Sequence, residues 1–137
     1  MDRPPRVVKF VKAELTSTGP NRCRGLVELK REGGRSCFGS ADGDCAEPEN
    51  LRCVAQATAN ALLQAVGADS DPVGFEIRVK EVAVQDTFGK HTVLVAVSGT
   101  YFKQRRDLLG LCVIETDPVK AAALAVLNAT NRFLGIG

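Results

Sequence analysis

Cysteine and histidine are the residue types in this sequence that offer the most chemistry, as metal ligands or as nucleophile and base. The chain has 137 residues and five cysteines, which are Cys23, Cys37, Cys45, Cys53 and Cys112. No two of them form a C-x-x-C pair, and His91 is the only histidine, so the spacing indicates no metal site. A chain of this length can form an apolar core that needs no disulfide bonds to hold it together. We therefore expect no disulfide framework and mostly buried thiols in a reducing compartment.

Cys45 and His91 are the two candidates for a reactive group. Cys45 lies beside Asp44 in an expected loop and should be accessible, but acidic neighbours disfavour the thiolate. His91 lies in an expected hairpin turn, where no recognisable spacing ties it to a carboxylate or a nucleophile. No Ser/His/Asp set or phosphate-binding loop accompanies them. We therefore predict no catalytic residue, no cofactor and no enzyme. A small thiol enzyme using Cys45 or Cys112 is an alternative.

The charged residues favour neither nucleic acid nor membrane as a partner. The 18 basic and 16 acidic residues are spread along the chain and give a net charge of +2. The basic stretch at residues 103–106 is typical of a charged hairpin that protects a strand from edge pairing. Nucleic-acid binding through this hairpin together with Arg22 and Arg24 is an alternative function. Because no apolar run reaches membrane-spanning length and no signal peptide is recognisable, we expect a cytoplasmic protein.

The last stretch of the chain, residues 110–137, has the clearest local structure. It reads as a strand, a tight turn and a helix rich in Ala, Leu and Val. Asp117 stands where an N-cap side chain would accept a hydrogen bond from a free backbone N–H group, and Pro118 suits the first helical position. The composition predicts a helix over 119–134 that Gly135 ends.

The same pattern occurs upstream. Alternating apolar residues predict strands over residues 6–15, 22–31 and 35–41, with a bend near Val11 where the apolar parity switches. A turn cluster fills residues 16–21, and a loop over 42–51 leads into a helix that Gly67 ends.

After residue 74 the sequence starts again, with strands predicted over residues 75–84, 92–98 and 106–114. The bend recurs, Gly39 corresponds to Gly110, and the helix pairs include Ala57 with Ala125 and Ala61 with Ala129. We therefore predict one α+β domain spanning residues 1–137. It would consist of two βββα units at 6–67 and 74–135, related by pseudo-twofold symmetry, with antiparallel strands and two helices packed on them.

The strands of the second unit contain unbroken apolar runs, which predict burial on both faces. Helices on one side of a sheet cover only one face, so the two half-sheets could cover each other or a second subunit could cover them. We expect a homodimer. The asparagines at equivalent positions of the two predicted helices could form hydrogen bonds across a pseudo-twofold contact, or they could face solvent. The residues assigned to packing or to the dimer are Val95, Val97, Leu109, Leu111, Asn60 and Asn128.

The loops between strand and helix, over residues 39–50 and 114–119, are the best candidates for a ligand site. A helix N-terminus suits a carboxylate, glycines allow close approach of a ligand, and an aspartate could accept an ammonium group. An amino-acid-like ligand would fit this chemistry. The assigned residues are Gly39, Gly43, Asp44, Thr116 and Asp117. Simple capping of the helices by these aspartates is the alternative.

Residues 115–133, ETDPVKAAALAVLNATNRF, resemble the end of the C-terminal regulatory domain of 2-isopropylmalate synthases. In that family an aspartate after a strand precedes a small-residue helix with an Asn-x-x-Asn-Arg ending, here Asn128, Asn131 and Arg132. The resemblance implies a pseudo-twofold pair of βββα units, a dimer and allosteric leucine binding.

The sequence departs from the family pattern in two ways. It lacks the catalytic barrel with its metal ligands, and Pro118 and Ala122 replace the family's usual Ile and Ser. The resemblance therefore implies a free-standing, non-catalytic regulatory or assembly module.

Overall fold

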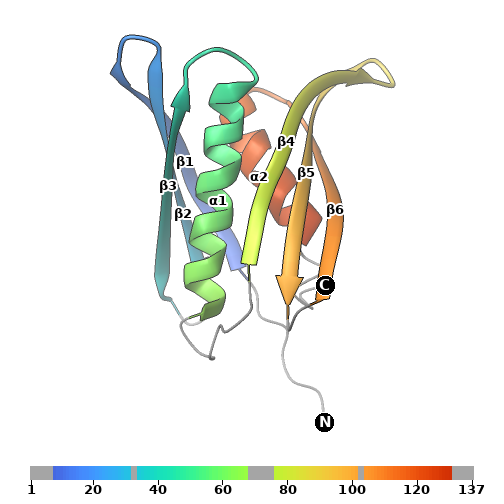
Figure 1. Cartoon of the computed structure of the whole chain (residues 1–137). Coiled ribbons are helices and arrows are strands. Elements are labelled where there is room, and N and C mark those ends of the chain that lie inside the picture. Colours follow the sequence, from blue (N-terminus) through green and yellow to red (C-terminus); the bar gives the residue numbers. More distant parts are fainter. Residues whose placement is uncertain (1–7, 32–33, 68–75, 102–103, 131–137) are drawn as a thin grey trace.

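The computed structural model describes residues 8–31, 34–67, 76–101 and 104–130, and it has an α+β fold of two βββα units (Figure 1). The first unit consists of β1 (Val8–Gly19), β2 (Arg22–Arg31), β3 (Ser36–Asp44) and α1 (Glu49–Gly67). The second consists of β4 (Glu76–Thr87), β5 (Lys90–Tyr101), β6 (Gln104–Val113) and α2 (Pro118–Thr130). The predicted fold class is therefore confirmed. The outer limits predicted for the repeats, at residues 6, 74 and 135, lie outside the described residues.

The two helices lie between two separate antiparallel sheets (Figure 1). The sheets have the strand orders β1-β2-β3 and β4-β5-β6. Helix α1 packs on β2 and β3 and also contacts β4, while α2 packs on β5 and β6 and also contacts β1. Each helix therefore joins the two units. The core fills the space between sheets and helices, and its fully buried residues include Leu29, Leu51, Val54, Val95, Val97 and Val126.

Both first strands contain a β-bulge at the same place. The pairing of β1 with β2 shifts register between Phe10 and Lys12, and the pairing of β4 with β5 shifts between Val79 and Glu81. One extra residue stands in each shift. The bend predicted near Val11, and its repetition in the second unit, are confirmed.

Two glycines fit the helices against their own sheets. A Cβ added to Gly39 would collide with the carbonyl oxygen of Ala57, and one added to Gly110 would collide with the carbonyl oxygen of Ala125. The paired glycines thus meet the paired alanines, as the alignment of the repeats predicts. Close packing of helix on strand explains why both positions lack a side chain.

The predicted helix ends agree with the structure where it describes them. Asp117 caps α2, since its Oδ1 accepts a hydrogen bond from the backbone N–H of Val119 at 2.9 Å. Helix α2 begins at Pro118 and α1 ends at Gly67, as predicted, whereas Gly135 lies outside the described residues. No helix in the described ranges is long and apolar enough to cross a membrane.

The strands extend further than their sequence pattern predicts. Strand β1 continues to Gly19, so most of the turn expected at 16–21 is strand, with Asn21 at a φ of 59°. Strand β3 continues to Asp44, so the first three residues of the loop expected at 42–51 are paired as well. The reason is that pairing with β2 satisfies the backbone of both segments, and this outweighs their turn-forming composition.

The expectation of no disulfide framework and an accessible Cys45 is wrong, because Cys45 forms a disulfide with Cys23. Arg22 pairs with Asp44 at the ends of β2 and β3, which brings the neighbouring cysteines together with their Cα atoms 5.1 Å apart. Strand pairing creates this contact across 22 residues of sequence.

Candidate functional site

The face of the second sheet that points away from the helices combines apolar and basic side chains. Along β5, Val93, Val95 and Val97 are buried toward the helices, so the residues between them point outward. The strand register aligns these outward residues in rows across β4, β5 and β6. Strand β6 supplies apolar side chains to three of the rows, and β4 supplies basic side chains near its start.

The apolar patch of this face consists of Ala83, Leu94, Ala96, Leu109, Leu111 and Val113. Leu109 lies directly opposite Ala96, and Leu111 lies opposite Leu94. The side chains of Leu109 and Leu111 are 82% and 52% exposed. The helices cover only the inner face, so one chain alone does not provide the burial on both faces that the apolar runs predict. Such a contiguous exposed apolar surface is typical of an interaction site.

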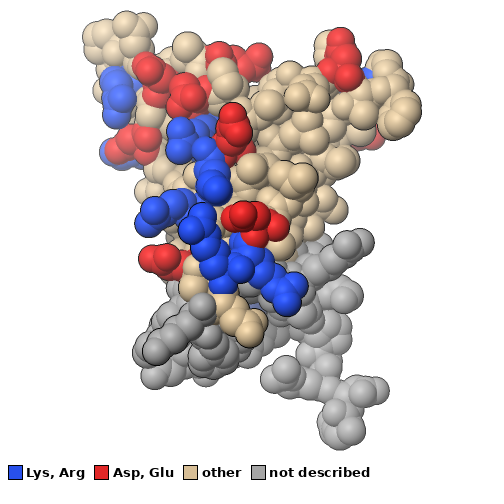
Figure 2. Space-filling view, turned by 45° about the vertical axis from the view of Figure 1, so that its right-hand side comes forward, with Lys and Arg blue, Asp and Glu red and all other residues tan. Residues whose placement is uncertain are grey.

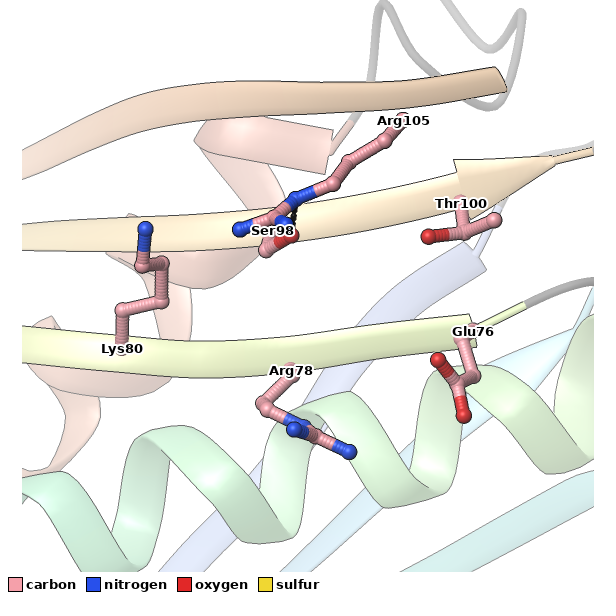
Figure 3. Close-up of a pocket in the computed structure, with 6 residues that line it drawn as sticks. All are labelled: Glu76, Arg78, Lys80, Ser98, Thr100 and Arg105. Carbon is pink, nitrogen blue, oxygen red and sulfur yellow. Dashed lines mark hydrogen bonds between the residues drawn. The ribbon is translucent and has the colours of Figure 1, made fainter. Parts of the chain in front are cut away.

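Next to the patch lies the basic hollow, formed by Arg78, Lys80, Ser98, Thr100, Arg105 and Glu76 (Figure 3). It is open to solvent and has a volume of about 210 Å³. Arg105 Nε donates a hydrogen bond to Ser98 Oγ at 3.0 Å. Lys80 Nζ lies 4.0 Å and Arg105 Nε 3.9 Å from the same carboxylate oxygen of Asp107. Within the described ranges, no acidic group lies within ion-pair distance of Arg78.

A second hollow, of about 420 Å³, lies between α1 and β4 and includes Arg52, Gln56, Glu76 and Arg78. Arg78 borders both hollows, so they meet at the free edge of β4. Figure 2 shows Lys and Arg side chains gathered in a band on this side of the molecule, beside a broad area with few charges. The basic residues are therefore more clustered in space than their even spread along the sequence predicts.

Amide side chains of the helices bond to the edges of the sheets. Asn60 Nδ2 donates to the carbonyl oxygen of Ser40 on β3 at 2.9 Å, and Asn128 Oδ1 accepts from the N–H of Leu111 on β6 at 3.2 Å. Gln56 Oε1 accepts from the N–H of Val79 on β4 at 3.1 Å, so α1 also bonds to the second sheet. The equivalent asparagines thus contact equivalent strands, each within its own unit.

The predicted ligand residues occupy different kinds of position. Gly39, Gly43 and Asp44 belong to β3, whereas Thr116 and Asp117 precede α2. The two strand-to-helix connections lie at the same end of the molecule (Figure 1).

The glycines of β3 face the chain's own helix. The Cβ position of Gly39 is occupied by α1, and a Cβ on Gly43 would collide with Cys53 Sγ. Thr116 and Asp117 are exposed, and the carboxylate of Asp117 is engaged as a cap. Binding of a ligand by these five residues stays a prediction.

The free thiols lack the environment of a nucleophile. Burial, followed by the nearby Glu49, raises the pKa of the Cys53 thiol, and burial, followed by Glu115, raises that of Cys112. A nucleophilic cysteine needs the opposite shift. In the described segments no group of three His, Cys, Asp or Glu side chains could hold a metal ion.

His91 is the second residue of β5 and not part of the turn. Its Nδ1 lies 2.6 Å from Asp86 Oδ1 across the strand pair, and both side chains are mostly exposed. The sequence analysis missed this carboxylate because the partner is defined by strand register. The pair lies beside the turn between β4 and β5.

Sequence reasoning did not assign Arg78, Lys80, Ser98 or Thr100 to a site. One signal was present in the sequence. Residues 78 and 80 are spaced two apart in one strand, and residues 98 and 100 are spaced two apart in the adjacent strand, as side chains on one face of a sheet are. Their meeting follows only from the register, which places Arg78 directly opposite Ser98. The stretch expected to be a basic hairpin contributes Arg105, while Lys103 lies outside the described residues.

The chain was compared with known proteins by sequence. No protein-family model matches it, and no curated protein matches it significantly.

Proposed function

We propose that this chain is a non-catalytic regulatory or assembly module that works as a homodimer, like the regulatory domain of 2-isopropylmalate synthases that its last quarter resembles. The observation that carries the proposal is the apolar patch, where the exposed Leu109 and Leu111 lie next to each other on one sheet face. A catalytic role has less support, since the free thiols Cys53 and Cys112 have raised pKa values.

The energetics of the patch support self-association. Full burial of one leucine side chain stabilises by about 1.5–3 kcal/mol. A dimer buries the patch of both copies. The resulting gain in free energy is comparable with the free-energy cost of association, roughly 4–15 kcal/mol. The patch lies on one face only, so face-to-face contact produces a closed dimer and not a filament.

Light scattering of the purified chain tests the dimer. We expect twice the mass of one chain, and we expect Leu109→Lys to halve that mass because it places a charge in the centre of the contact. The matched control is Phe38→Lys, at the equivalent position of the first sheet, where Phe38 is 57% exposed. Monomeric mass for the unmodified chain, or equal effects of the two variants, would contradict the proposal.

A thermal-shift series with branched-chain amino acids tests the regulatory part. Binding to the folded state raises the melting temperature as ligand concentration rises. We expect one of these amino acids to stabilise the chain and Asp44→Asn to weaken that response. If none has an effect while the dimer persists, assembly alone is the supported function.

A further inference from the structure

The basic hollow gathers like charges that the packing of the core does not require. Arg78 and Lys80 are outward residues on one strand, and Arg105 reaches the same hollow from β6. Figure 3 shows Lys80 and Arg105 converging beside Ser98, so these two cations repel each other when the hollow is empty, while Arg78 borders the hollow from the α1 side of β4. The apolar core and the helix contacts lie on the other face of the sheet and do not require them.

The acidic groups nearby do not neutralise the three cations. One carboxylate, that of Asp107, is shared between Lys80 and Arg105 at 4.0 and 3.9 Å, and its side chain is 73% exposed. Exposed pairs of this kind contribute only about 0–1 kcal/mol, so they yield readily to a stronger anion. Glu76 also borders the hollow. Figure 3 shows Lys80 and Arg105 directed toward β5, away from Glu76, whereas Arg78 is directed away from β5 on the same side as Glu76.

The donors that face the hollow suit a compact oxyanion. Guanidinium groups offer paired N–H donors, and the ammonium group of Lys80 offers a strong charge. Ser98 Oγ accepts a hydrogen bond from Arg105, which leaves its own O–H free to donate to a ligand. Thr100 adds a second hydroxyl from the same strand. Phosphate, with several acceptor oxygens and up to two negative charges, matches this set better than a carboxylate.

We propose that the basic hollow binds the phosphate group of a small phosphorylated ligand. Its volume, about 210 Å³, corresponds to roughly seven water molecules, which accommodates a phosphate group and the first atoms attached to it. The open side of the hollow leaves the rest of the ligand in solvent or along the groove toward α1.

The β-bulge of β4 supplies the additional cation. It inserts Lys80 on the outer face next to Arg78, whereas the equivalent bulge of β1 inserts Val11. The first sheet has Lys9 opposite Lys30 where the second has Arg78 opposite Ser98. The first sheet therefore provides two matched basic residues, with Ser36 beside Lys30 in the same row on β3, and the two basic residues serve as controls.

Amide NMR titration with inorganic phosphate, against sodium chloride at equal ionic strength, tests the proposal. We expect saturable shifts at Arg78, Ser98 and Thr100. Loss of a charged hydrogen bond should weaken phosphate binding about tenfold in Arg78→Gln, and Lys30→Gln should leave it within about twofold. Arg105→Gln provides a second variant if the spectrum of Arg78→Gln shows a changed fold.

The titration is repeated on Leu109→Asn, which disrupts the apolar contact without adding a charge beside the hollow, so a failure of the proposed dimer does not affect the result. Shifts that do not saturate, or equal weakening by Lys30→Gln, would overturn the site. Citrate binding as tightly as phosphate would overturn the assignment to phosphate. Duplex RNA that shifts the same amides at much lower concentration would identify a nucleic-acid surface in its place.

Discussion

The two βββα units have the same interior and different exteriors. At equivalent positions of the outer faces, the first sheet pairs Arg24 with Asp42 and the second pairs Thr92 with Val113. One step along the strands, the first sheet has Leu26 opposite Ser40 where the second has two leucines. The two units thus share the inward-facing residues that helix packing requires. The outward positions, which packing does not constrain, carry an ion pair beside the exposed Leu26 and Phe38 in one unit, and an apolar patch with a basic hollow in the other.

The largest effect on stability is expected at the glycines that pack in the same way against the helix of each unit. Gly39→Ala and Gly110→Ala should each lower the free energy of unfolding by about 3 kcal/mol or more, because the new methyl group collides with helix backbone. Urea unfolding measures this. Gly19→Ala is the control, since no atom lies within 4 Å of its Cβ position. If only one of the two buried glycines tolerates alanine, the units do not pack equivalently.

The disulfide distinguishes the two units more strongly than any other covalent feature. Replacing both Cys23 and Cys45 by alanine should cost about 2–3 kcal/mol, because the bond closes a loop across 22 residues in the unfolded chain. Denaturant unfolding with and without reductant measures the loss. Reductant should not destabilise the double variant further. An unmodified chain that is insensitive to reductant would show that the bond contributes no stability.

The bond from α1 to β4 has no counterpart in α2, which has Leu124 at the position of Gln56. Gln56→Leu installs that residue and leaves the N–H of Val79 without its partner. We expect a loss of about 1 kcal/mol in urea unfolding. Gln64→Leu is the comparison, because its partner Phe38 N–H lies at an exposed position where water can substitute. A larger loss for Gln64→Leu would reverse our ranking of the two bonds.

The smallest effect concerns the outer ion pair of the first sheet. The hydrogen bond from Arg24, at 2.7 Å, lowers the pKa of Asp42 below its ordinary value of 3.8. A lowered folded pKa contributes stability above pH 3.8, and this contribution is lost as pH falls through the folded pKa. Arg24→Gln should move the NMR titration of the Asp42 carboxyl upward. An unchanged titration midpoint would show that the pair does not form in solution.

Features encoded by neighbouring residues could be predicted from the sequence. The cap at Asp117, the bulge near Val11 and the matching of Gly39 with Gly110 each depend on a short segment or on the repeat. For the same reason the order of elements was correct although strand ends were short by several residues. Pairing partners extend a strand beyond the limits that its own composition sets.

Features that depend on register between strands could not be predicted. Cys23 meets Cys45, His91 meets Asp86, and Arg78 meets Ser98 only because of which residues face each other across a ladder. Without the register, cysteines and cations can be compared only with their neighbours along the chain. The pattern along the chain therefore points to the loops, while the structure brings polar donors together on the outer face of the second sheet.

The contact of each helix with the first strand of the opposite unit has a consequence for the origin of the fold. A single βββα segment would leave one side of its helix uncovered. The edge of its first strand would lack a hydrogen bond to an amide side chain of a helix. Two separate copies of such a segment would supply these surfaces to each other and rebuild the same closure. The crossed helix contacts and the repeat therefore fit an origin by duplication of one βββα segment, after which each half could acquire its own exterior.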